Sequence, residues 1–239
     1  MTVGSLRSRA AAFPILLALT ACRPAPTMRP ASPADAPTTP APAAATAPRP
    51  AEVAWSFPVP GGDLPREPNL LPGADREYRG GIHEGVDLFH RTDGSDLPCG
   101  TQVVASHPGY IVRADHNWKA MTVREYDFLI SALKGRRDEG QLDRLRGRQV
   151  WVQADDGRVS RYCHLASVST DLAVGVRVEA GTLVGTLGNS GTQDGSKGTK
   201  SNCHLHFEVR LPPDGAYLGR DLGAKASRHL FAGLFNLPD

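Results

Sequence analysis

The 239-residue chain contains few aromatic residues and few cysteines, and its positive and negative charges almost balance. Aromatic residues make up 6%, four residues are cysteine, and 27 Lys and Arg stand against 25 Asp and Glu. This near balance of charge does not suggest the clustered Lys and Arg that a nucleic-acid-binding protein needs. The longest apolar run, AAAFPILLALTA at residues 10–21, is too short for a permanent membrane-spanning helix.

This apolar run instead predicts an export signal. Arg7 and Arg9 precede it, as in the charged start of a signal peptide, and it ends in Leu-Thr-Ala-Cys22. The ending resembles the lipobox of bacterial lipoproteins, which implies that residues 1–21 are removed and that Cys22 is lipidated. An ordinary secretory signal with an incidental cysteine is the alternative. The residue after the lipidated cysteine, residue 23, is an arginine. An aspartate at this position would resemble an inner-membrane retention signal. In a cell with two membranes, we therefore expect a lipid anchor in the periplasm-facing outer membrane.

Residues 22–50 predict a linker. From residue 23 to residue 50, 9 of 28 residues are proline, most of the others are Ala or Thr, and none is aromatic. Such a segment buries no core and is expected to be extended. At about 3.1 Å per residue it would span at most roughly 90 Å. Loss of residues 1–21 removes two arginines and no acid, so 25 basic residues would then balance 25 acidic ones.

Residues 51–239 are enough for one domain, and their pattern predicts a mainly β fold. Short apolar strands alternate with turn residues, which indicates an antiparallel, sandwich-like sheet core with the site at one open face. Three hairpins are expected: one around Pro108-Gly109, one around Asp156-Gly157 and one within residues 174–188.

A small helical insert is predicted at about residues 117–148, between two strands. Thr122 and Glu125 form a capping-box pattern, the helical apolar spacing then continues to Gly135, and a second helix is expected around residues 141–145. The insert could flank the cleft and restrict which substrates enter, or it could cap an otherwise exposed sheet. On the first hypothesis, its deletion would alter substrate range rather than zinc content.

Three short runs carry the chemistry. In NCHLHFEVR, strand alternation places His204 and His206 on one face, and imidazole pairs suit zinc. GIHEGVDLF adds His83 and Asp87, and RYCHL adds His164. A catalytic zinc usually keeps three protein ligands and a water position, so five candidates leave histidines for proton transfer.

These runs resemble the LytM/lysostaphin-type zinc metallopeptidases, which cut peptide cross-links of bacterial peptidoglycan. The HxGxD motif is present from His83 to Asp87, and the HxH motif from His204 to His206. Between them lie Tyr-x-His-Leu, which ends at Leu165, and the Gly-rich GTLVGTLGNSG. The resemblance covers roughly residues 55–212 and implies the duplicated hybrid-motif fold.

By the same resemblance, Zn²⁺ would be held by His83, Asp87 and His206. The catalytic residues would be His164 and His204, which face the water and the scissile carbonyl. We expect His204 to act as the base and His164 to stabilise the oxyanion. The implied substrates are peptidoglycan stem peptides or cross-bridges.

Three function classes follow. The first is an active cell-wall endopeptidase, which the complete set of motif residues favours. The second is a non-catalytic LytM-type activator of a separate cell-wall amidase. The third is a wall-binding lipoprotein with a structural zinc, which would normally have a closed shell of four ligands.

Four further side chains allow alternatives. Glu208 shares the face of His206 and could be its partner, although a solvated strand-end carboxylate is the favoured interpretation. Beyond Cys22 the chain has Cys99, Cys163 and Cys203, an odd number that allows at most one internal disulfide. Alternation is expected to turn Cys163 and Cys203 away from the site, where they could pair with each other or pack as small buried residues.

Overall fold

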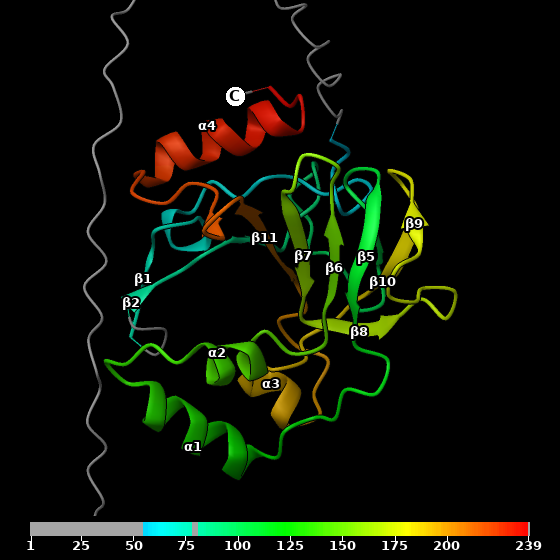
Figure 1. Cartoon of the computed structure of the whole chain (residues 1–239). Helices are drawn as coiled ribbons and strands as arrows, with labels where there is room; N and C mark the ends of the chain where they lie inside the picture. The colour runs from blue at the N-terminus through cyan, green and yellow to red at the C-terminus, as the bar shows by residue number, and fades with distance from the viewer. Residues whose placement is uncertain (1–54, 78–80, 239) are drawn as a thin grey trace, which may run out of the picture. The chain divides into compact units, whose positions relative to one another are not determined.

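The computed structural model describes residues 55–77 and 81–238 (Figure 1). The predicted signal peptide, the lipidation site Cys22 and the predicted linker lie outside the described residues. Within the described part of the chain, no helix combines the length and the apolar character needed to cross a membrane.

Two antiparallel sheets form the body of the fold, as the sequence predicted. The larger sheet has the order β12-β11-β7-β6-β5-β9, with β3 also paired to β11, and the smaller has the order β4-β10-β8. The strands of the larger sheet are β3 (Val86–Leu88), β5 (Gly109–Ala114), β6 (Val150–Gln153), β7 (Val159–Cys163), β9 (Arg177–Val178), β11 (Leu205–Leu211) and β12 (Ala216–Tyr217). The smaller sheet contains β4 (Gln102–Val104), β8 (Leu165–Val168) and β10 (Leu183–Leu187). A separate pair joins β1 (Asp75–Arg76) and β2 (Gly81–Ile82).

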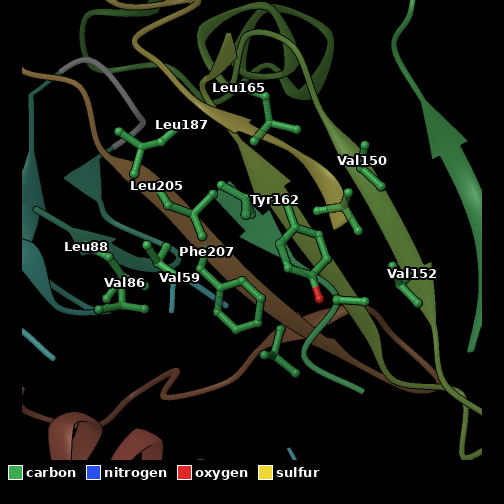
Figure 2. Packing of buried hydrophobic residues seen from close by; sticks show 14 of the residues in the cluster. Val59, Val86, Leu88, Val150, Val152, Tyr162, Leu165, Leu187, Leu205 and Phe207 are labelled. Atoms are coloured by element: carbon green, nitrogen blue, oxygen red, sulfur yellow. The ribbon is translucent and has the colours of Figure 1, made fainter. Parts of the chain in front are cut away.

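The core lies between the two sheets, which makes the domain sandwich-like. Figure 2 shows Leu165 and Leu187 of the smaller sheet near Tyr162, Leu205 and Phe207 of the larger one. All five side chains are fully buried. Because alternate residues of a strand point to opposite faces, filling the core with Leu205 and Phe207 sends their neighbours on β11 to the other face.

Only one of the three predicted hairpins is confirmed. Strands β6 and β7 pair around Asp156-Gly157. The other two predictions are wrong, because β4 pairs with β10 while β5 pairs with β6 and β9. At both turns the chain crosses from one sheet to the other. Consecutive strands with apolar inner faces satisfy the same pattern whether they lie side by side or face each other across a sandwich.

The helical insert is confirmed between β5 and β6. It contains α1 (Val123–Leu133) and α2 (Glu139–Leu145), and the capping box of Thr122 and Glu125 is present at the start of α1. The insert has an apolar cluster of its own, formed by Met121, Leu129, Leu133, Leu142 and Leu145. The remaining helices are η1 (Pro68–Leu70), α3 (Gln193–Ser196) and α4 (Ala224–Leu234). Figure 1 shows α1, α2 and α3 grouped at one end of the domain and α4 at the other.

Candidate metal centre and cleft

The pairing of β3 with β11 brings two distant motifs together. Asp87 and His206 are direct partners across these strands. The glycine between His83 and Asp87 is required by the close approach of the two strands. A Cβ on Gly85 would lie 2.5 Å from the carbonyl oxygen of Phe207 and 2.9 Å from Cε1 of His206. The HxGxD pattern therefore reflects a packing constraint as well as ligand chemistry.

Three potential ligand atoms converge at this point. His83 Nε2 lies 3.1 Å from Asp87 Oδ1 and 3.0 Å from His206 Nδ1. His206 Nδ1 lies 2.7 Å from Asp87 Oδ1. All three side chains are buried, and together they form a group that could hold a metal ion.

The hydrogen bonds on the far side of each ring fix which nitrogen faces the cluster. His83 Nδ1 donates to the carbonyl oxygen of Leu71 at 3.0 Å, and His206 Nε2 donates to Glu208 Oε1 at 2.9 Å. Both partners are acceptors, so the neutral rings turn lone pairs toward Asp87. When the rings instead carry protons on the Asp87 side, burial by itself would raise the pKa of Asp87, but the charge of His83 and the hydrogen bonds from His206 and His83 would hold it well below its usual range. Three acceptor atoms in contact are best satisfied by a cation.

Glu208 lies directly behind His206, and the expectation of a solvated strand-end carboxylate is wrong. Its side chain is 0% exposed, because β11 is flanked by other strands on both sides. Arg146 Nε donates to Oε1 at 2.6 Å, and Arg210 Nε donates to Oε2 at 2.9 Å. Burial would raise the pKa of Glu208, but these two guanidinium groups and the hydrogen bond from His206 hold it well below its usual range. The carboxylate is thus kept ionised behind the ring.

His164 and His204 lie beside the cluster. Their ring centroids are 4.7 Å apart, and His204 Nε2 is 3.9 Å from Asp87 Oδ1. In both rings Nδ1 donates to a backbone carbonyl, that of Ser190 for His164 at 2.8 Å and that of Asn202 for His204 at 2.9 Å. Nε2 is therefore the atom of each neutral ring that can accept a proton. All five motif residues are brought together in one place.

The backbone of His164 also explains an error in the expected position of Cys163. His164 has a φ of 62°, so the regular alternation of β7 ends at this residue. Cys163 is the direct partner of His206 across β7 and β11, and directly opposed residues share a face. Cys163 therefore lies on the same side of the sheet as the metal-ligand candidates. Tyr162, one residue earlier, faces the core against Phe207.

The disulfide joins Cys99 to Cys203, with a Cα–Cα distance of 5.3 Å, and pairing of Cys163 with Cys203 is excluded. The physical reason is the difference in face, because Cys203 packs on the core side with Leu205. The bond fixes the chain immediately before His204.

A cleft of about 310 Å³ opens over His164 and His204. Tyr126 of α1 and Leu145 of α2 line one part of it, which confirms that the insert flanks the cleft. The polar loop at residues 192–202 contributes another wall. The full lining is Leu70, Arg76, Asp87, Phe89, Tyr126, Leu145, His164, Gly191, Thr192, Gln193, Asp194, Asn202 and His204. The lining of the cleft does not include the four histidines outside the motifs, which are His90, His107, His116 and His229.

A mainly β domain with antiparallel sheets and few short helices is the fold of LytM-type domains. The family model of peptidase family M23 matches residues 81–218. This match covers more than half of the chain, which therefore belongs to peptidase family M23.

Solved structures show a more distant similarity. The SpoIIQ-SpoIIIAH pore-forming complex contains a chain that is 20% identical, with 70% of this chain and 87% of that chain covered and a TM-score of 0.42. A zinc-containing peptidase from Vibrio cholerae is 16% identical, with 72% and 39% covered and a TM-score of 0.42. The catalytic domain of lysostaphin from Staphylococcus simulans is 23% identical, with 68% and 83% covered and a TM-score of 0.35. The chain thus spans well under half of the length of the Vibrio peptidase. No curated protein matched the chain.

Proposed function

We propose that the chain is a zinc-dependent endopeptidase that hydrolyses peptide cross-links of bacterial peptidoglycan. The observation that supports this most strongly is the convergence of three acceptor atoms, from His83, Asp87 and His206, with two further imidazoles at the same cleft. A purely structural metal site would not need those two imidazoles. The complete set of motif residues favours the enzyme over a non-catalytic activator of an amidase, and membership of peptidase family M23 is compatible with both.

The donor set fits zinc. His83 Nε2, Asp87 Oδ1 and His206 Nδ1 would be the ligands, and imidazole nitrogen with carboxylate oxygen is a usual catalytic zinc set. When bound, the zinc supplies polarisation of the scissile carbonyl and lowers the pKa of a water molecule toward about 7. Three protein ligands leave a position for that water.

The chain's own residues would move the proton. His204 Nε2 faces Asp87, so it is placed to accept a proton from the attacking water. The carbonyl of Asn202 holds the other nitrogen of this ring, and Phe89 stacks on it with ring centroids 4.3 Å apart. The proton that His204 accepts would then pass to the leaving amine, while His164, protonated at Nε2, would donate a hydrogen bond to the oxyanion. The Ser190 carbonyl fixes its orientation.

The test of this proposal is the release of soluble peptides from purified peptidoglycan by the protein without residues 1–21, with and without a chelator. We expect release that stops on chelation and returns with zinc. His164→Ala is expected to keep one zinc per chain and to lower the rate about 10²–10⁴-fold, as for loss of a positioned acid or base. His116→Ala is the matched control, because this exposed histidine binds the Leu172 carbonyl and does not line the cleft.

The outcomes separate the candidate functions. Zinc bound at one per chain without cleavage of any wall type would contradict the endopeptidase and favour the amidase activator. Stimulation of a cell-wall amidase would then be measured. Cleavage that survives chelation would contradict the zinc mechanism. The masses of the released fragments would identify the bond that is cut.

We also propose that the chain is exported and anchored by a lipid on Cys22, with residues 22–50 as the spacer to the wall. The Cys99–Cys203 disulfide supports export, because stable disulfides are typical of oxidising compartments outside the cytosol. Labelling of cells with a radioactive fatty acid is expected to mark the wild-type chain and not Cys22→Ala. Equal labelling of both chains would contradict this assignment.

A further inference from the structure

Arg146 connects the helical insert to the metal-ligand candidates. It is the residue at the end of α2, and its side chain is only 3% exposed. Its Nε donates to Glu208 Oε1 at 2.6 Å, and one terminal nitrogen donates to Glu84 Oε2 at 2.8 Å. Glu84 lies next to His83 in the sequence. A single guanidinium group from the insert therefore holds both the carboxylate behind His206 and the carboxylate of the residue that follows His83.

The contact with Glu208 is specific for one oxygen. Oε1 is the atom that accepts the hydrogen bond from His206 Nε2, and it is the atom that Arg146 holds. Arg210 and Arg161 bind the other oxygen, Oε2. The side chain of Arg146 thus fixes the acceptor that sets the orientation and tautomer of the His206 ring.

The backbone of the same segment holds the second histidine. The carbonyl oxygen of Arg146 accepts a hydrogen bond from the backbone N–H of His164 at 2.9 Å. Gly147 follows with a φ of +68°, and a Cβ there would lie 2.2 Å from the carbonyl oxygen of Ser190. That oxygen accepts the hydrogen bond from His164 Nδ1, and Ser190 Oγ accepts one from the backbone N–H of Arg148. Residues 146–148 therefore fix both the backbone and the ring of His164.

We infer that Arg146 is a positioning residue for the metal centre, acting through Glu208 on the ring of His206. This inference rests on the proposed zinc site. The helical insert then has a role beyond flanking the cleft, because its last residues are the support of the site. Deletion of residues 117–148 is accordingly expected to impair zinc binding, in contrast to the expectation from sequence that only substrate range would change.

The test is the zinc affinity of the protein without residues 1–21, measured by competition with a chromophoric chelator. Arg146→Gln is expected to weaken zinc binding about 10–100-fold, the usual cost of losing a partner behind a ligand. Arg144→Gln is the matched control and should bind zinc like the wild type. Arg144 carries the same charge on the same helix, but it is about half exposed and its ion pair is with Glu125. Thermal unfolding of each variant is measured in parallel.

A second readout reports on the ring directly. In the zinc-free protein, the NMR signal of the His206 Nε2 proton is expected to shift or broaden in Arg146→Gln and to stay unchanged in Arg144→Gln. A merely structural role for Arg146 would lower the unfolding temperature without moving this signal. The double variant Arg146→Gln/Glu208→Gln is expected to bind zinc no more weakly than Glu208→Gln alone, because both changes act through one contact.

The outcomes distinguish this inference from the proposal on which it rests. If the wild type binds zinc and folded Arg146→Gln binds it equally tightly, the positioning role is wrong and the endopeptidase proposal stands. If the wild type binds no zinc, the metal centre itself is wrong. If Arg146→Gln does not fold, the test uses Arg146→Lys instead. Lysine keeps the positive charge but lacks the planar guanidinium group that can bind two carboxylates at once. Unchanged zinc affinity in Arg146→Lys would then contradict the inference.

Discussion

Replacement of His206 by alanine is expected to abolish both zinc binding and peptidoglycan cleavage. His206 contributes one of the three converging ligand atoms, and its other nitrogen binds the ionised Glu208. The variant would lose a ligand and also leave a buried carboxylate without one of its donors. We expect the loss of zinc affinity to exceed the roughly 100-fold change that follows loss of an outer partner. The rate of peptide release should fall to background.

The measurement is the zinc content per chain after dialysis, together with peptide release from purified peptidoglycan. His116→Ala serves again as the control for a histidine-to-alanine change. Wild-type protein treated with a chelator should behave like His206→Ala, and only the wild type should recover when zinc is added back. A His206→Ala variant that retains one tightly bound zinc would show that the ligand assignment is wrong.

Loss of the Cys99–Cys203 disulfide is expected to have the largest effect on stability. The two cysteines are 104 residues apart, so the bond closes a long loop in the unfolded chain. In the chain-entropy account, a native disulfide of this kind contributes about 2–5 kcal/mol to the free energy of unfolding. Because Cys203 directly precedes His204, the same change should also loosen the residue proposed as the base.

Urea unfolding of Cys99→Ser, Cys203→Ser and the double variant tests this prediction. The three variants should be destabilised to a similar extent, because each removes the same bond and the double change removes nothing more. Wild-type protein unfolded with a reducing agent is the matched reference. Single variants as stable as the oxidised wild type would contradict the prediction. Strictly additive losses would indicate that side-chain packing matters more than the bond.

Features that depend on short stretches of chain were predictable from the sequence. The alternation of β11 placed His206 and Phe207 on opposite faces, and the capping box of Thr122 fixed the start of α1. The hairpin of β6 and β7 followed from its Asp-Gly turn. The grouping of His83, Asp87 and His206 also followed from the motifs, whereas the zinc and the reaction stay predictions from the chemistry of imidazole and carboxylate groups. The assignment to an M23-type β fold rests on the same motifs.

Features that depend on which segments meet were decided only by the tertiary structure. The same alternating pattern suits strands that pair in one sheet and strands that face each other across a core, so two hairpins were predicted wrongly. Glu208 was expected in solvent, but the strands on either side of β11 bury it. No local signal links Arg146 to Glu208, 62 residues later, or assigns the partner of Cys203. Sequence determined the chemistry of each residue and, within a regular strand, its face, whereas long-range pairing determined its burial and its partners.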